Sequence, residues 1–322
     1  MKTTTLGAAG PEVGVIGLGC MGMTHAYDPD GRDDATSVAV LHRAVELGVT
    51  LIDTADVYGP YTNEELVGRG LEGLRDRVVL ATKVGLELGP QGLTSSMSGM
   101  KLNGRPEHVR RSIDESLRRL RTDHVDLYQL HRVDTKVPIE ETWGALAEAV
   151  QAGKARAIGL SEVTVEQIER AQAVHPVASV QSELSLWTRD ALADVVPYCE
   201  AHGIAFLPFS PLGRGFLTGT MASVDDLPAG DWRRTMPRFQ AETIAANQAI
   251  VAAVRAIADR AGATPAQVAL AWVRAQGAYV IPIPGTKTPK YLVDNAAAGD
   301  LTLSDEDLAE LDALPAPEGT RY

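Results

Sequence analysis

The chain has 322 residues, of which 45% are hydrophobic and 22% charged, and its formal net charge is −12. This composition is ordinary for a globular protein, and a chain of this length buries a large core without help from disulfides or metals. The negative charge argues against general nucleic-acid binding, which needs a basic face. No stretch approaches the roughly 18–20 apolar residues that span a bilayer, so we expect no membrane segment.

The N-terminal segment and the cysteines bear on cellular location. Residues 1–19 contain one lysine and no apolar run of signal-peptide length, so we expect no secretion signal. Cys20 and Cys199 are the only cysteines. Two thiols in a chain of this size favour a reducing compartment over a disulfide framework. We therefore expect a cytoplasmic protein.

Eight short β-rich runs alternate with amphipathic stretches along the chain. Most are near-continuous apolar runs, which is typical of parallel strands that are buried on both faces. The predicted strands are 13–17, 49–53, 77–82, 125–130, 155–160, 177–181, 204–208 and 278–282.

Helical patterns separate these strands. Two of them begin with clear start signals, namely Thr164 with Gln167 and Thr264 with Pro265 and Gln267. Eight βα repeats without a break in composition predict an α/β fold, a (β/α)₈ TIM barrel, as one domain over residues 1–322. An amphipathic stretch at 304–314 predicts an extra C-terminal helix. The other predicted helices are 37–47, 63–73, 106–120, 140–152, 164–173, 189–202, 243–261 with 265–275, and 288–297.

Polar residues follow three successive predicted strands. Strand two ends in Asp53, strand three in Lys83 and strand four in His131, and Tyr58 lies five residues past Asp53. Active sites of such barrels lie at the C-terminal ends of the strands. Each residue alone has a structural explanation, as a loop cap, a solvated strand end or a packed side chain. Their combination at one barrel mouth predicts a catalytic site.

These four side chains suit the reduction of a carbonyl group. Tyrosine has a reference pKa of about 10, and a nearby ammonium such as Lys83 stabilises its phenolate and lowers that pKa. A carboxylate such as Asp53 keeps a buried lysine charged and in place. A neutral histidine orients the substrate oxygen, and with the tyrosine hydroxyl it stabilises the charge that develops on that oxygen.

The sequence strongly resembles the aldo-keto reductase superfamily over nearly its whole length. The resemblance rests on the segments LIDTADVYG, LATKVG, VDLYQLHRVD, ARAIGLSEV, FSPLGRGFLTG and IPIPGTK with LVDN. Within the family, the sequence most resembles microbial NADP-dependent reductases. It implies an NADPH-dependent oxidoreductase that converts aldehydes or ketones to alcohols, with NADP(H) as cofactor and a small-molecule carbonyl substrate. It also implies a catalytic tetrad of Asp53, Tyr58, Lys83 and His131, in which Tyr58 is the general acid.

The same resemblance implies a cofactor site. Ser161 and Gln181 match residues that hold the nicotinamide carboxamide, and Gly285, Thr286 and Lys287 match the loop at the adenosine phosphate. A glycine-containing loop that opens a helix is a good anion site, and Lys287 and Lys290 supply charge for a 2′-phosphate. The remaining residues assigned to the cofactor are Gly22, Met23, Asp53, Phe209, Ser210, Pro211, Leu212, Gly213, Arg214, Tyr291 and Asn295.

Three positions depart from the family pattern. Glu162 stands where many members have asparagine, which affects a hydrogen bond to the carboxamide. Phe209 stands where many have the tyrosine that stacks on the nicotinamide, and a phenyl ring can still stack. Tyr291 stands where many have an arginine for the 2′-phosphate, which bears on the preference for NADPH, although Lys290 is adjacent.

Residues 17–22, GLGCMG, match the dinucleotide fingerprint of a doubly wound fold. Asp53 even mimics the acid that binds the ribose there. The fingerprint requires a helix at its third glycine, whereas Pro29 and Gly31 follow here and a helix begins only near Ser37. We therefore expect these glycines to let the first strand end approach the nicotinamide.

Two other functions stay open from the sequence. Some barrels of this family are cofactor-binding, redox-sensing regulatory subunits, and the intact tetrad argues against pure sensing. A hydrolase or lyase that uses Asp53 and His131 with a metal lacks an HxH or HExxH arrangement, so we expect no metal site.

The substrate pocket is expected to come from the loops 21–36, 84–104, 132–137 and 210–242, of which the last is long enough to cover the catalytic face. The physiological substrate and the oligomeric state are not specified by the sequence. Candidates for an apolar wall are Met21, Met23, Tyr27, Trp143, Trp187, Phe216 and Trp232.

Overall fold

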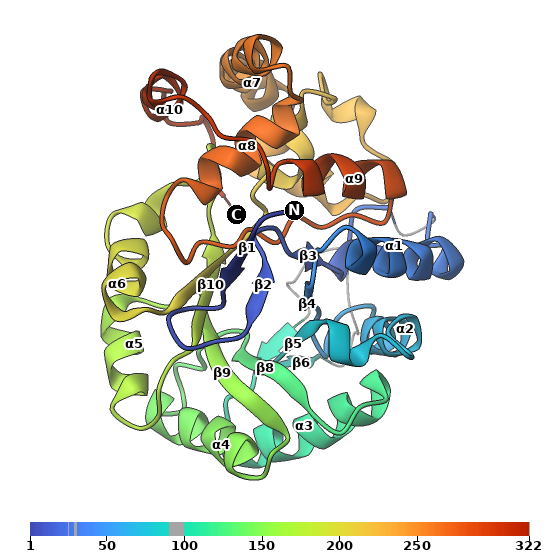
Figure 1. Ribbon diagram of the computed structural model, residues 1–322, viewed down its shortest axis with the longest axis vertical. Helices are drawn as coiled ribbons and strands as arrows, with labels where there is room; N and C mark the ends of the chain where they lie inside the picture. The colour runs from blue at the N-terminus through green and yellow to red at the C-terminus, as the bar shows by residue number, and fades with distance from the viewer. Residues whose placement is uncertain (25, 29–30, 90–99, 322) are drawn as a thin grey trace.

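The computed structural model describes residues 1–24, 26–28, 31–89 and 100–321. Seven parallel strands form one curved sheet in the order β11-β10-β9-β8-β5-β4-β3, and helices surround it (Figure 1). The strands are β3 (Leu18–Gly19), β4 (Leu51–Asp53), β5 (Val79–Val84), β8 (Val125–Leu130), β9 (Ala155–Ser161), β10 (Ser179–Glu183) and β11 (Ala205–Phe209).

The predicted eighth strand, 278–282, lies where it was expected but forms only isolated bridges. Val280 bridges to Phe206 on β11, and Gly285 bridges to Gly19 on β3, so this segment joins the two edges of the sheet. Pro282 and Pro284 have no backbone N–H and cannot donate to a ladder. Their carbonyl groups still accept hydrogen bonds from the β3 side, which closes the barrel.

The prediction of a first barrel strand at 13–17 is wrong. Residues Glu12–Gly14 form β2, which pairs with β1 (Thr3–Thr5) as an antiparallel hairpin outside the barrel sheet. The hairpin crosses the middle of the ring of strands in Figure 1. Val13 packs with the apolar residues inside the barrel, and the barrel strand itself begins at Leu18. An apolar run in the sequence does not distinguish a segment that packs inside the barrel from a strand of the barrel sheet.

The helices agree with their predicted positions to within a few residues at most ends. The stretch 189–202 is the exception, because a short 3₁₀ turn at Asp190–Leu192 precedes the helix. Both predicted capping boxes, at Thr164 and Thr264, are present. The α-helices are α1 (Asp34–Glu46), α2 (Thr62–Gly70), α3 (Pro106–Leu120), α4 (Ile139–Gln151), α5 (Val165–Gln172), α6 (Val195–His202), α7 (Ala241–Ala261), α8 (Pro265–Arg274), α9 (Pro289–Ala297) and α10 (Asp305–Asp312), the last being the expected extra C-terminal helix.

Side chains along each barrel strand alternate between the helix layer and the barrel interior. Leu51, Ala81 and Leu127 belong to the inner apolar cluster, whereas the outward-facing Ile52 and Leu80 pack under the helices. Two residues beyond each inner residue, the side chain faces inward again. This period places the ends of β4, β5 and β8 around one opening.

Two irregular regions lie around that opening. A small hairpin of β6 (Leu86–Leu88) and β7 (Met100–Leu102) follows β5, and part of this predicted pocket loop, 90–99, lies outside the described residues. The stretch 210–240 contains four short 3₁₀ segments, at Gly213–Thr218, Val224–Asp226, Trp232–Thr235 and Pro237–Phe239. In the described ranges, no helix is both long and apolar enough to cross a membrane.

Candidate active site

Asp53 and Lys83 form a buried ion pair at the ends of β4 and β5. The Lys83 Nζ donates to Asp53 Oδ1 at 2.5 Å and to the carbonyl oxygen of Thr54 at 2.8 Å. The Lys83 side chain is 1% exposed and that of Asp53 is 4% exposed. Because water scarcely reaches either group, each charge is stabilised mainly by its ion-pair and hydrogen-bond partners inside the protein.

Two glutamines hold the second oxygen of the carboxylate. Gln181 from β10 donates to Asp53 Oδ2 at 2.9 Å, and Gln129 from β8 donates to the same atom at 3.2 Å. Asp53 thus accepts hydrogen bonds from three neighbouring side chains, all of which face into the barrel. Its orientation, and through it that of Lys83, is fixed by this set.

Tyr58 and His131 lie beside the ion pair. Their rings meet edge to face with centroids 5.8 Å apart, and the Lys83 Nζ lies 5.2 Å from the centroid of the Tyr58 ring. Tyr58 is 8% exposed and His131 is 4% exposed. The four residues that the sequence singles out at separate strand ends and loops are therefore brought together at one place.

Burial and neighbouring charges together determine the pKa values of this cluster. It raises the pKa of Tyr58 above its usual value, and the nearby Lys83 ammonium, which acts to lower that pKa, offsets only part of the effect. The net lowering expected from the sequence is therefore not found. Burial also lowers the pKa of His131 well below its usual value, with Arg132 and Lys83 acting in the same direction. Burial acts to lower the pKa of Lys83, but Asp53 and Tyr58 outweigh it and the pKa is raised.

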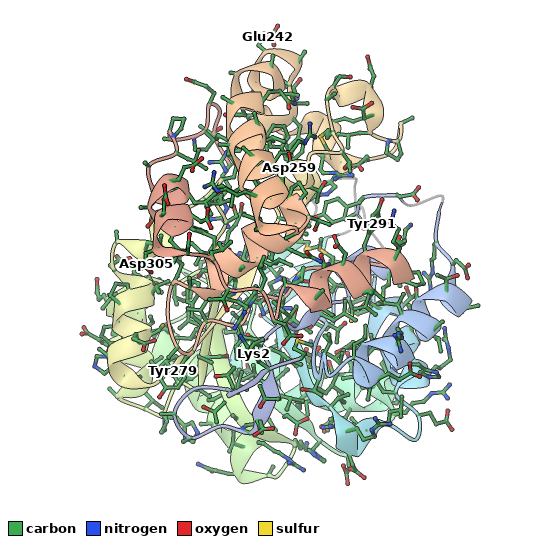
Figure 2. All side chains as sticks on the ribbon, turned by 45° about the horizontal axis from the view of Figure 1, so that its top comes forward. Lys2, Glu242, Asp259, Tyr279, Tyr291 and Asp305 are labelled. Carbon is green, nitrogen blue, oxygen red and sulfur yellow. The ribbon has the colours of Figure 1, made fainter. Side chains whose placement is uncertain are left out.

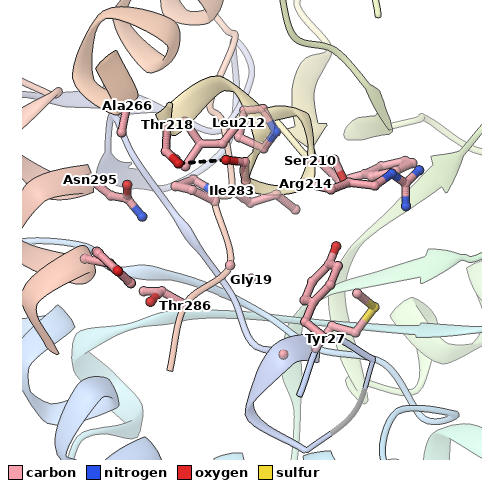
Figure 3. A pocket seen from close by; sticks show the side chains of 18 of the residues that line it. Gly19, Tyr27, Ser210, Leu212, Arg214, Thr218, Ala266, Ile283, Thr286 and Asn295 are labelled. Carbon is pink, nitrogen blue, oxygen red and sulfur yellow. Dashed lines mark hydrogen bonds between the residues drawn. The ribbon is translucent and has the colours of Figure 1, made fainter. Parts of the chain in front are cut away.

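A cavity of about 840 Å³ runs from this cluster to α9. In Figure 3, Tyr27, Ser210 and Arg214 lie toward one side of it and Thr286 and Asn295 toward the other. Most residues that the resemblance assigns to a cofactor line this cavity. They are Gly22, Asp53, Ser161, Gln181, Phe209, Ser210, Pro211, Leu212, Arg214, Gly285, Thr286, Lys287, Tyr291 and Asn295.

Two assigned residues do not line the cavity. Met23 is fully buried in the outer apolar core, and the buried Gly213 approaches the ring of Trp187. The apolar wall is also smaller than expected. Met21, Tyr27 and Trp232 line the cavity, whereas the other candidates, Trp143, Trp187 and Phe216, are fully or almost fully buried packing residues.

The α9 end of the cavity has two lysines that differ in their contacts. Lys287 Nζ is bonded to Asp28 Oδ2 at 3.1 Å and to the carbonyl oxygen of Gly31 at 2.7 Å, so it ties two loops together. Lys290 also lines the cavity and has no ion pair within the described part of the chain. Tyr291, labelled on α9 in Figure 2, is 52% exposed.

An ionic network that the sequence did not reveal lies next to the Phe209 ring. Arg321, next to the end of the chain, donates to Glu162 at 2.6 Å and to Glu183 at 2.7 Å, and its guanidinium lies 5.5 Å from the Phe209 centroid. Glu183 also accepts from Arg214 at 2.8 Å. Glu162, the departure noted above, thus has a partner 159 positions away, which no local pattern could indicate.

Two other arrangements raised by the sequence can be compared with the structure. The described residues contain no group of three or more His, Cys, Asp or Glu side chains placed to hold a metal ion. The GLGCMG segment leads into a short 3₁₀ turn at Met21–Met23, and α1 begins only at Asp34, so the fingerprint of a doubly wound fold is not formed.

Comparison with known proteins identifies the family to which the chain belongs. Residues 15–316 match the model of the aldo/keto reductase family. The chain is 44% identical to a probable aldo-keto reductase 1 of Glycine max, over 100% of this chain and 92% of that protein. Its fold superposes on a glycerol dehydrogenase from Gluconobacter oxydans with a TM-score of 0.85 and 31% identity, over 99% of each chain.

A second solved structure is an aldo/keto reductase from Klebsiella pneumoniae, determined in complex with NADP and acetate. It has a TM-score of 0.75 and 31% identity, over 99% of this chain and 97% of that one. The family match covers most of the chain, and the relatives are covered almost completely. The chain belongs to the aldo-keto reductase family, and its fold is the (β/α)₈ barrel of that family.

Proposed function

We propose that the protein is an NADPH-dependent reductase that converts aldehydes or ketones to alcohols, with Tyr58 as general acid. The observation that carries the proposal is the convergence of Asp53, Lys83, Tyr58 and His131 at one end of a cavity of about 840 Å³. Family membership supports oxidoreductase activity in general. The tetrad supports the particular step.

The cavity fits NADP(H) at both ends. Gln181 uses its amide N–H groups on Asp53 and Gln129, so its carbonyl oxygen remains available to accept from a carboxamide, and the Ser161 hydroxyl lines the cavity beside it. Lys290 offers positive charge at the α9 end for a 2′-phosphate. The solved Klebsiella pneumoniae relative binds NADP, which supports the same choice here.

In this proposal NADPH, when bound, supplies the hydride from C4 of its nicotinamide to the carbonyl carbon. Tyr58 donates its proton to the carbonyl oxygen, and its high pKa keeps that proton in place until the transfer. Lys83 then stabilises the phenolate that is left. His131, held neutral by its low pKa, donates a hydrogen bond to the substrate oxygen without adding a charge.

Cellular location and domain organisation follow from the same proposal. The chain would act as one domain over residues 1–322, in the cytoplasm, on a small carbonyl compound. Both cysteines are free and buried, which accords with a reducing compartment. The alternative function is a redox-sensing regulatory subunit. The intact Asp53–Lys83 ion pair favours catalysis over this alternative, because sensing alone does not need that pair.

The test is NADPH oxidation with a panel of activated aldehydes, wild type against Tyr58→Phe. We expect turnover by wild type and a loss of at least roughly a hundredfold in kcat for the variant, the scale of general-acid catalysis. Tyr198→Phe, a tyrosine on the outer helix α6, is the matched control and should keep wild-type activity. NADPH binding without turnover by any variant would favour the regulatory alternative, and failure to bind NADPH would refute the proposal.

A further inference from the structure

The cationic side chains that line the cavity differ in whether a carboxylate neutralises them. Arg214 is paired with Glu183 at 2.8 Å, and Arg233 is paired with Asp231 at 2.5 Å. Lys287 is paired with Asp28 in the same way. These charges are balanced within the protein, so they have little need of a ligand for charge compensation.

Arg132 is different. It follows His131 directly, lines the cavity and is half-buried, yet it forms no ion pair with any described residue. Its hydrogen bonds are to the carbonyl oxygen of His131 at 2.6 Å and to Ser161 Oγ at 3.0 Å, and both use Nη1. The Nε and Nη2 groups have no hydrogen-bond partner in the described part of the chain.

The carboxylates of the neighbouring strand ends and loop are already engaged elsewhere. Glu162 accepts from Arg321 at 2.6 Å and from the backbone of Glu183 at 3.0 Å. Asp134, two residues beyond Arg132, accepts from the backbone of Gly104 at 3.1 Å and of Lys136 at 3.0 Å. The protein thus places a cation in the cavity and commits the surrounding acids to other partners.

The donors that remain on Arg132 have a particular geometry. Nε–H and one N–H of Nη2 lie along the same edge of the planar guanidinium and point in nearly parallel directions. That edge matches the two oxygens of a carboxylate and binds them bidentately. Because Nη1 is anchored to the ends of β8 and β9, the plane of the group is held while this edge stays available.

The guanidinium of Arg132 lies at the end of the cavity that contains Tyr58 and His131. Arg132 is close enough to act electrostatically on both Tyr58 and His131. Tyr27 and Trp232, whose rings lie 6.1 Å apart, provide an apolar surface in the same cavity. A substrate here therefore meets the tetrad, a guanidinium edge and an aromatic surface.

We propose that Arg132 binds a carboxylate on the substrate, so that the enzyme prefers aldehydes or ketones that carry a carboxylate on a short or aromatic spacer. This inference rests on the proposed reductase function and narrows its substrate class. The alternative role for Arg132 is to position the Ser161 hydroxyl for the cofactor, in which case charged and neutral substrates would be served equally.

The experiment compares 4-carboxybenzaldehyde with its neutral methyl ester, at a fixed saturating NADPH concentration and constant ionic strength. The readout is the ratio of kcat/KM for the charged aldehyde to that for the ester, measured in wild type, Arg132→Met and Arg132→Lys. Taking this ratio cancels any effect of the substitution on the cofactor or on folding. Arg118→Met, an exposed arginine on α3, controls for the loss of one positive charge elsewhere.

We expect a wild-type ratio well above one, a fall of about tenfold or more in Arg132→Met, and partial recovery in Arg132→Lys, as for a charge-assisted hydrogen bond. The control should keep the wild-type ratio. Equal losses for both aldehydes in Arg132→Met, or a wild-type ratio near or below one, would overturn the inference while leaving the reductase function intact. No turnover of either aldehyde by wild type would instead contradict the reductase function itself.

Discussion

At Tyr58, burial and a neighbouring charge act in opposite directions. Burial raises the pKa of its hydroxyl, whereas Lys83 lowers it, and burial has the larger effect. Reduction needs a tyrosine that still holds its proton when a carbonyl group arrives. In the proposed reaction Tyr58 would then act as a poised acid and not as a preformed phenolate, and Lys83 would act mainly after the proton has left.

His131 makes stability depend on pH in a defined sense. An unfolded histidine titrates near pH 6.5, while burial keeps the folded pKa of His131 well below that value. As the pH falls below about 6.5, the unfolded chain binds this proton before the folded one does. The free energy of unfolding therefore decreases with falling pH, with a contribution of up to about 1.4 kcal/mol per pH unit.

The substitution His131→Asn should remove that contribution. We expect urea unfolding measured from pH 7.5 to 5.5 to show a smaller loss of stability in the variant than in wild type. His42→Asn, on the exposed side of α1, is the control for replacing a histidine elsewhere. If wild type and His131→Asn lose stability in parallel, His131 is not kept neutral by burial.

The convergence of Asp53, Lys83 and His131 on one opening could be predicted because a strand has a simple period. Leu51 and Asp53 face the same side, as do Ala81 and Lys83, and parallel strands end at the same edge. Arg132 could not be assigned from the sequence. Its importance depends on Glu162 and Asp134 being engaged by other groups, which only the three-dimensional structure shows.

Among the elements, the long stretch 210–240 is held by a few specific contacts. Asp231 pairs with Arg233, whose Nη1 also donates to the carbonyl oxygen of Arg214 at 2.6 Å. The Arg233 guanidinium lies 4.7 Å from the Tyr27 ring centroid. This segment is thereby fixed to the loop after β3, across the cavity.

Asp231→Ala should loosen this segment. The Asp231 side chain is fully buried, and removal of one partner of a buried ion pair typically costs about 3–5 kcal/mol. We expect trypsin to cleave the folded variant faster than wild type at Arg233 or Arg234. Asp225→Ala removes a carboxylate that is 87% exposed and should leave the rate unchanged. Equal cleavage of all three proteins would show that the pair does not hold the loop.

The predictions of helices and strands were correct where residues close in sequence determine the structure. They failed where the structure depends on how the barrel sheet closes. The caps at Thr164 and Thr264 depend on residues three positions away, and both are present as predicted. In the run 13–17, Val13 packs inside the barrel, whereas Val15 and Ile16 pack against Leu270. Pro282 and Pro284 limit the eighth strand to bridges. Those outcomes depend on contacts between the two ends of the chain.

For the whole molecule, the buried thiols offer a measure of global unfolding. Cys20 is 0% exposed and Cys199 is 1% exposed, and burial raises the pKa of Cys199 to about 12. We expect neither thiol to react with a thiol-specific reagent at pH 8 until the barrel unfolds, and both to react in denaturant. Rapid labelling of the native protein would mean that α6 or the loop after β3 opens locally.

Transfer of a labelled hydride from NADPH to the product would test the proposed reduction directly. NADPH that carries deuterium at C4 of its nicotinamide would be incubated with the enzyme and an activated aldehyde, and the alcohol product analysed by mass spectrometry. With label at each C4 position in turn, we expect one deuterium on the former carbonyl carbon from one position and none from the other. Tyr58→Phe should greatly reduce the rate of this transfer. An alcohol without deuterium from either position, or equal product formation by Tyr58→Phe, would contradict the proposed reduction.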